Sequence, residues 1–190
     1  MTQKTPVPTL DNPTFKKVKD AFPGLKLRGT EFRAQSTLIV EPESLHRVMT
    51  FLRDGCGYNF LSDVTGVDYL NYPTPMPGRF GVVYNLCNYD TTEEAGDRFF
   101  VKVFLDPSIP TDGIVEDPAL YVDSVTDLWP GAEWMERELF DMFGIRFHNH
   151  PDLRRILTWE AFPAHPLRKD YPLRGRGERE DYRIVDRTSS

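Results

Sequence analysis

Three of the four histidines, His148, His150 and His165, are the side chains in this sequence best suited to hold a metal ion. A His-x-His pair joined by a more distant histidine can supply three of the four ligands of zinc. Alternate residues share a face only in a true strand, however, and no acidic or cysteine ligand follows at a customary interval. We therefore favour histidines held by hydrogen bonds beside Pro151 and Pro166 over a metal site.

Acidic residues form a second candidate site, because paired carboxylates can act as general acid and base. On a helix, Glu138 and Asp141 are neighbours, whereas Glu136 points away. Glu133, Arg137 and Asp141 follow at four-residue spacing, which predicts a cation held between two carboxylates. The sequence also lacks the G-x-S-x-G, Walker and G-x-G-x-x-G motifs of hydrolases, NTPases and dinucleotide-binding folds. Ion pairing is thus favoured over catalysis.

Basic residues gather toward the C-terminus, where residues 154–190 carry 9 Lys+Arg and 6 Asp+Glu in a chain of net charge −6. Basic side chains interleaved with aromatic ones can bind nucleic acid. The overall pI of about 5.3 argues against that role for the whole protein, and arginine and aromatic residues are equally typical of protein interfaces. The basic residues considered for such binding are Arg154, Arg155, Arg168, Lys169, Arg174 and Arg176, and the aromatic ones are Trp159, Phe162, Tyr171 and Tyr182.

Length and composition predict one ordinary domain with extensions, since the chain has 190 residues and a mean hydropathy of −0.46. No apolar run approaches the roughly 18 residues of a membrane span, and the N-terminus lacks the apolar stretch of a signal peptide. We expect a cytoplasmic protein that reaches a membrane only through a partner. Cys56 and Cys87 form no C-x-x-C motif, so an iron–sulfur or zinc cluster held by this chain alone is not expected.

Hydrophobic periodicity predicts elements in the order α-β-β-α-β-β-β-α. The expected helices cover residues 13–22, the stretch from Pro42 to Gly55, and residues 133–143 before Gly144. The expected strands cover residues 25–28, 30–40, 58–64, 79–88 and 98–105, and residues 122–129 are expected to form a short helical turn. This order predicts an α+β fold, a mixed and mainly antiparallel sheet with helices on one side. The domain limits are a flexible leader (1–11), an α+β domain (12–157) and an extended partner-binding tail (158–190), of which 178–190 are expected to be mobile.

Several segments carry a family resemblance. Glu136-Arg137-Glu138, the following Asp-Met-Phe-Gly and HPDLRRIL (150–157) closely resemble the signature of the C-type subunit of NADH-quinone oxidoreductase, respiratory complex I. The likeness continues in HPLRKDYPL (165–173), LSDVTGVDYL (61–70), RFGVVYNL (79–86) and SVTDLWPGAEW (124–134), and it covers roughly residues 36–175. Ala164 departs from the glycine expected before His-Pro, which affects the local turn.

The resemblance implies a cofactor-free structural and assembly subunit in the peripheral arm, on the cytoplasmic side of the cell inner membrane. Such a chain has no active site, docks on the D-type subunit at the quinone site, and also contacts the B-type iron–sulfur subunit and a ferredoxin-like subunit. FMN and iron–sulfur clusters belong to partner subunits, and the complex couples electron transfer from NADH to quinone with proton pumping. The partner interface implied by the signature comprises Glu136, Arg137, Glu138, Asp141, His150, Asp152, Arg154, Arg155, Arg168 and Lys169.

Three alternatives remain open. The chain could be the equivalent subunit of a related membrane-bound hydrogenase or of a ferredoxin- or plastoquinone-linked complex. It could, in a different class, be a free-standing nucleic-acid-binding protein that uses the basic tail. It could also be a metal-dependent hydrolase built on the three histidines.

Overall fold

The computed structural model describes residue 10 and residues 12–89 and 98–178 of the chain. The expected flexible leader and the expected mobile end therefore lie almost entirely outside the described residues. Within the described ranges, no helix combines the length and the apolar character that a bilayer crossing requires.

In the described part of the chain, the centre of the fold is a five-stranded sheet with the strand order β1-β2-β5-β4-β3. Its members are β1 (Arg28–Phe32), β2 (Gln35–Val40), β3 (Phe60–Asp68), β4 (Phe80–Cys87) and β5 (Arg98–Leu105). Neighbouring strands pair antiparallel except for β2 and β5, which pair in parallel. The prediction of a mixed, mainly antiparallel sheet is confirmed.

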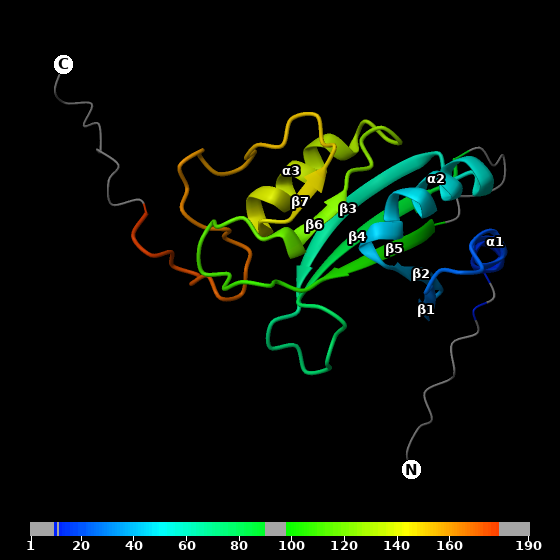
Figure 1. Cartoon of the computed structure of the whole chain (residues 1–190), viewed down its shortest axis with the longest axis horizontal. Coiled ribbons are helices and arrows are strands. Elements are labelled where there is room, and N and C mark those ends of the chain that lie inside the picture. The colour runs from blue at the N-terminus through cyan, green and yellow to red at the C-terminus, as the bar shows by residue number, and fades with distance from the viewer. Residues whose placement is uncertain (1–9, 11, 90–97, 179–190) are drawn as a thin grey trace, which may run out of the picture.

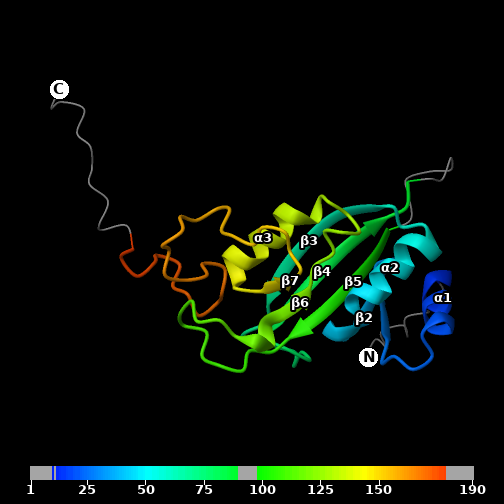
Figure 2. The ribbon, with the colours of Figure 1, turned by 45° about the horizontal axis from the view of Figure 1, so that its top comes forward.

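Helices α1 (Pro13–Ala21), α2 (Leu45–Cys56) and α3 (Ala132–Phe143) lie on the same side of the sheet, as Figures 1 and 2 show. The ring of Phe15 in α1 packs 5.2 Å from that of Phe99, and Phe143 in α3 lies 6.4 Å from Phe80. Both sheet residues are fully buried. The hydrophobic core therefore fills the space between one sheet face and the helices, which confirms the predicted α+β class.

Side chains that alternate along the strands divide the sheet into a covered face and an open face. On β5, the odd-numbered residues from Phe99 to Leu105 are at most 3% exposed and point toward the helices. The even-numbered residues from Phe100 to Phe104 point the other way and are half-buried. We call these two sides the covered face and the open face.

Two further short strands precede and follow α3 in the sequence and pair with each other in parallel. They are β6 (Tyr121–Asp123) and β7 (Arg146–His148). The 3-10 helices η1 (Pro42–Ser44) and η2 (Pro118–Leu120) precede α2 and β6. The predicted helical turn over 122–129 is therefore wrong at its start, where the chain is extended. Strands of three residues are too short to show a period of two, so periodicity could not reveal this pair.

Several element limits also differ from the prediction: β1 covers Arg28–Phe32 rather than 25–28, and β3 covers Phe60–Asp68 rather than 58–64. The strand expected over 30–40 is interrupted at Arg33 and Ala34, whose φ angles of +50° and +60° form a tight turn between β1 and β2. Neither residue type favours positive φ, so the sequence carries no signal of this turn. Helix α2 continues past Gly55 and ends at Gly57, where a φ of +82° provides the left-handed helix end.

Candidate functional site

Helix α3 positions most of the side chains singled out from the sequence. It has no proline, glycine or β-branched residue, and it ends at Gly144 with a φ of +74°, as predicted. Phe143 packs so closely on β3 that a Cβ at Gly66 would lie 2.7 Å from its ring. This close approach fixes the rotation of α3 and turns Glu136 and Asp141 inward, and both are 0% exposed.

Asp141 holds the segment of residues 155–158, which we call the anchored loop. Its Oδ2 accepts hydrogen bonds from the backbone N–H groups of Ile156, Leu157 and Thr158 at 3.1, 2.7 and 2.8 Å. Its Oδ1 accepts from Arg155 Nη1 at 2.6 Å and from the Thr158 hydroxyl. Burial alone would raise the pKa of Asp141, but the hydrogen bonds, led by those from Thr158, outweigh it and lower the pKa to about 2.

Arg155 joins α3 to the chain that follows the anchored loop. Besides the Asp141 carboxylate, its guanidinium donates to the carbonyls of Phe162 at 2.8 Å and Ala164 at 3.1 Å. Arg137 donates to the carbonyls of Arg154 and Arg155 at 3.1 and 2.9 Å. The predicted pairing of Arg137 with the carboxylates of Glu133 and Asp141 is therefore wrong, because Arg137 donates to backbone carbonyls instead.

Glu136, five residues earlier on α3, occupies a different environment. Its carboxylate accepts from the Ser124 hydroxyl at 2.6 Å and the Val125 N–H at 2.9 Å. Burial raises the pKa of Glu136 to about 7; the hydrogen bonds from Ser124 and Val125 lower it and the charge of Asp127 raises it further. The hydroxyl of Tyr84 is also buried, and burial followed by the charge of Glu136 raises the pKa of Tyr84 well above its usual value.

His150 lies beside Glu136 without forming an ion pair. Its Nε2 is 3.0 Å from the carbonyl of Glu133, which can only accept, so Nε2 carries the proton. The backbone N–H of Asp152 donates to Nδ1 at 3.1 Å, so this nitrogen is an acceptor. The ring is therefore neutral, and its 3.9 Å approach to the Glu136 carboxylate is not a salt bridge.

The three histidines do not come together. His148 stacks on Tyr121 with ring centroids 4.6 Å apart, and His165 donates from Nδ1 to the carbonyl of Asp141 at 2.9 Å. Burial lowers the pKa of His165 to about 4, so its ring is neutral near pH 7. Across residues 12–89 and 98–178, no group of three or more His, Cys, Asp or Glu side chains is arranged to hold a metal ion. The prediction of hydrogen-bonded histidines is confirmed for His150 and His165.

Residues beyond 158 are partly built into the domain. Arg168 is 5% exposed and donates to the carbonyls of Phe143 at 2.6 Å and Thr111 at 2.9 Å. Burial lowers the pKa of its guanidinium to about 10. The backbone N–H of Lys169 donates to Asp68 at 2.8 Å. The division of the chain at residue 157 stays a prediction, but the segment behind it is fastened to both α3 and β3.

Sequence reasoning missed an ion-pair chain at the end of β3. Arg79 contacts Asp68 at 3.0 Å and Asp170 at 2.9 Å, and the three residues tie the 69–79 loop to the C-terminal segment. The signal available was that Asp68 and Arg79 flank one loop between two paired strands. Asp170 is too distant in sequence to have been added.

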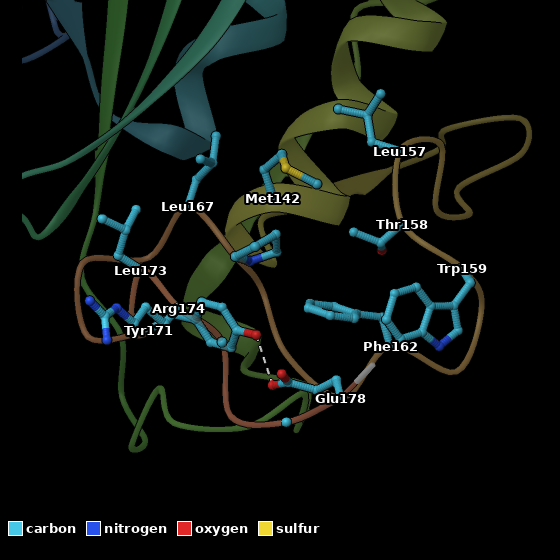
Figure 3. A pocket seen from close by; sticks show the side chains of 13 residues that line it. Met142, Leu157, Thr158, Trp159, Phe162, Leu167, Tyr171, Leu173, Arg174 and Glu178 are labelled. Carbon is cyan, nitrogen blue, oxygen red and sulfur yellow. Dashed lines mark hydrogen bonds between the residues drawn. The ribbon is translucent and has the colours of Figure 1, made fainter. Parts of the chain in front are cut away.

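A groove of about 810 Å³ lies between α3 and the C-terminal segment (Figure 3). Leu157, Leu167 and Leu173 are among its lining residues and are 64%, 53% and 103% exposed. The Tyr171 hydroxyl donates to Glu178 at 2.7 Å across one side of it. Its lining comprises Met142, Leu157, Thr158, Trp159, Phe162, Pro166, Leu167, Tyr171, Leu173, Arg174, Gly175, Gly177 and Glu178.

Burial separates the ten residues expected at a partner interface into two groups. Five have side chains enclosed by this chain itself: Glu136, Asp141, His150, Arg155 and Arg168. Glu138, Asp152, Arg154 and Lys169 are exposed, and Arg137 is half-buried. The interface role stays a prediction for all ten residues, and the enclosed side chains also hold the fold of the region within this chain.

Comparisons with known proteins agree with the family resemblance. Residues 38–177 match the model of the family described as the respiratory-chain NADH dehydrogenase, 30 Kd subunit. The C-type subunit of NADH-quinone oxidoreductase from Citrifermentans bemidjiense is 43% identical over 173 residues, which are 91% of this chain and 96% of that protein. NADH-quinone oxidoreductase subunit 5 of Thermus thermophilus is 50% identical over 121 residues, 62% of this chain, and the match spans only about half (52%) of the Thermus protein.

The fold is similar to that of a solved structure, Nqo5 of a trypsin-resistant fragment (1-134), with a TM-score of 0.58 and 32% identity. That similarity covers 76% of this chain and all of the fragment. The chain therefore belongs to the family of the 30-kDa subunit of respiratory-chain NADH dehydrogenase.

Proposed function

We propose that this chain is a cofactor-free structural subunit in the peripheral arm of an NADH-quinone oxidoreductase, and that it docks on the D-type subunit at the quinone site. The relatives named above are subunits of NADH-quinone oxidoreductase. The observation that carries the docking role is the groove of Figure 3, where Leu157, Leu167 and Leu173 expose apolar side chains beside a backbone fastened by many hydrogen bonds.

The physical argument is that the groove exposes apolar side chains to water, which is unfavourable unless a partner covers them. Contiguous exposed apolar side chains on a folded surface mark a site for a protein partner. Trp159, Phe162 and Tyr171 supply aromatic walls, and aromatic residues with arginine are enriched among interface residues that dominate binding. Arg174 at the rim and the exposed Arg154 nearby in sequence suit an acidic partner surface.

The redox chemistry belongs, in this proposal, to other subunits. Iron–sulfur clusters need sets of cysteine thiolates, and the sequence holds only Cys56 and Cys87. We place the flavin and the clusters in partner subunits, including the B-type iron–sulfur subunit and a ferredoxin-like subunit near this chain. The complex passes electrons from NADH to quinone and moves protons, and this chain lies on the cytoplasmic side of the inner membrane, attached through the complex.

Replacing Leu173 by glutamate tests the docking role. The side chain is 103% exposed, so a charge there leaves the fold intact but interrupts an apolar interface. We expect recovery of the chain with the tagged quinone-site subunit to fall at least about tenfold, the equivalent of 1.4 kcal/mol. Val115→Glu is the matched control, because Val115 is 73% exposed and does not line the groove.

Equal recovery of both variants with the quinone-site subunit would contradict docking through the groove. Mass spectrometry of the companions, with or without NADH-binding subunits, separates this complex from related hydrogenases.

A further inference from the structure

The open face of the sheet carries a second surface that the groove does not use. Strand register places one row of side chains across all five strands of the described sheet. The row comprises Arg28, Ile39, Lys102, Val83 and Thr65. On either side of Lys102 along β5 stand Phe100 and Phe104, both half-buried. No described helix covers this side of the sheet in Figures 1 and 2.

The lysine at the centre of this row contacts aromatic side chains but forms no ion pair with a described carboxylate. Lys102 Nζ donates to the Tyr69 hydroxyl at 3.0 Å and lies 5.6 Å from the Tyr69 ring and 5.7 Å from the Phe104 ring. No carboxylate among the residues the structure describes forms an ion pair with Lys102 or with Arg28. The aromatic contacts orient the ammonium group and leave its charge unpaired within the described chain.

The row through Lys102 has a charge opposite in sign to that of the molecule as a whole. The chain has a net charge of −6, yet the row through Lys102 carries two cations and no acid. In the neighbouring row through Phe100, register adds Asp63 as an acidic member. A cationic, partly apolar patch on an acidic protein favours an anionic partner surface.

The patch also offers a place for an apolar side chain. A groove of about 390 Å³ adjoins the row at its β1–β2 end, where Arg28, Ile39, Pro77 and Phe104 line it. Lys26 and Glu41 also line this groove, and their charges offset each other in an ion pair at 3.9 Å. Apolar contacts here lie beside the guanidinium of Arg28. A partner element must therefore combine an apolar stripe with carboxylates along its edge.

We infer that the open face docks an acidic amphipathic helix of another subunit of the assembled complex, with its carboxylates on Lys102 and Arg28. A helix fits because one sheet face packs against the apolar stripe of a helix, as the covered face already does with α1–α3. The acidic pI of about 5.3 disfavours nucleic acid on this surface. The partner is thus a protein, and this interface is separate from the groove of Figure 3. The inference rests on the proposed function in one respect, namely that the chain is part of a larger complex.

Chemical labelling of the unmodified protein tests the inference. Lysines are acetylated in the isolated full chain and in the purified complex, and the rate at Lys102 is compared between them. We expect acetylation of Lys102 to slow at least about tenfold in the complex because its ammonium is enclosed. Lys16 and Lys19 on the exposed side of α1 are internal controls. An unchanged Lys102 rate in a complex that contains the chain would overturn the inference while leaving the proposed function intact.

A photo-crosslinking residue in place of Thr37, which register places beside Phe100 on the open face, identifies the occupant. Adducts on an acidic helix of another subunit support the inference. Adducts on a second copy of this chain, on lipid or on nucleic acid, or no adduct in the complex, overturn it.

A pair of charge variants completes the test. Lys102→Glu is expected to reduce crosslinking from Thr37 at least about tenfold, whereas Lys19→Glu leaves it unchanged. Lys102→Met retains the packing of the side-chain stem and is expected to give an intermediate loss, which separates loss of charge from loss of fold. Equal crosslinking by all three variants would count against charge pairing at Lys102.

Discussion

The two buried carboxylates of α3 lie five residues apart, have the same exposure of 0%, and behave in opposite ways. Asp141 receives three backbone N–H groups, a hydroxyl and a guanidinium, and its pKa is lowered to about 2. Glu136 receives one backbone N–H and one hydroxyl without a cation, and burial raises its pKa to about 7. Burial alone therefore does not decide the ionisation of an acid; the number and charge of its donors do.

The comparison also separates two structural tasks. Asp141 fastens a loop that leads into the C-terminal segment, and it does so as a fully charged group. Glu136 fastens the β6–α3 connection through Ser124 and Val125, and it changes charge near neutral pH. Helix α3 thus fastens the anchored loop through a carboxylate that stays charged near neutral pH. It fastens the β6–α3 connection through a carboxyl group that titrates there.

Removal of the Asp141 carboxylate gives the largest expected effect. Asp141→Ala leaves the Arg155 guanidinium buried without its anion and three N–H groups without an acceptor. We expect the free energy of unfolding to fall by about 3–5 kcal/mol, measured by urea denaturation. Asp152→Ala is the control, since the Asp152–Arg154 pair is exposed and contributes at most about 1 kcal/mol. Similar losses in the two variants would show that Asp141 is no anchor.

The pH dependence of Glu136→Gln is the next largest effect. Because the folded-state pKa of about 7 exceeds the ordinary value of 4.5, stability from Glu136 is complete below pH 4.5 and is lost as pH rises to 7. The neutral amide removes this loss, so at pH 8 the variant is expected to be more stable than the wild type by up to about 3 kcal/mol. For Asp141 the sign is reversed, since its stability is present above pH 3.8 and is lost toward pH 2. Urea titrations at several pH values distinguish these slopes, and a parallel pair of curves for variant and wild type would refute the assignment to Glu136.

Gly144→Ala tests whether the two regions are independent. A methyl group at this left-handed position would lie 2.7 Å from His165 Nε2 and would also meet Arg168, so we expect a loss of about 1–3 kcal/mol. The damage belongs to the Asp141 end, so the fall in stability between pH 4.5 and 7 is expected to keep its slope. Thermal unfolding of the variant across this pH range provides the measurement. A flattened slope would mean that the two ends of α3 are coupled.

Arg154→Glu has the smallest expected effect on stability. The Arg154 side chain is 63% exposed, so its loss changes the free energy of unfolding by less than about 1 kcal/mol while recovery in the complex falls. Arg155→Glu is the contrast, because its side chain is 7% exposed and its replacement disrupts the anchored loop first. Denaturation and co-purification of both variants are compared; an Arg154 variant that unfolds as easily as the Arg155 variant would remove the distinction.

Much of the fold follows from local patterns in the sequence. The apolar spacing of α3 and Gly144 at its end predict the helix and its stop, and the β-prone run from Arg98 to Leu105 predicts β5 to the residue. The turn at Arg33–Ala34 and the β6–β7 pair escape because they depend on tertiary packing rather than on residue type. Here local propensity is overruled by what the neighbouring strands require.

The sequence predicts which residues belong to the candidate site, but it does not predict how they are arranged. The signature marks Asp141, Arg155 and Arg168, yet charged residues suggest a surface, whereas the structure encloses all three. Their hydrogen-bond partners are mostly backbone groups, and the sequence does not show which backbone groups a side chain will meet in the fold. The role of Ser124 as a donor to Glu136 was missed for the same reason, because only the fold brings them together.

The parallel pairing of β6 with β7 has a consequence for how the chain folds. Its two strands are contributed from opposite ends of α3, so the pairing closes a loop that contains the whole helix. The entropic cost of closing this loop must be met before the pairing contributes to stability. During synthesis, the pairing of β2 with β5 can therefore form as soon as β5 has emerged, whereas Val122 can pair with Phe147 only after the whole of α3 has been made.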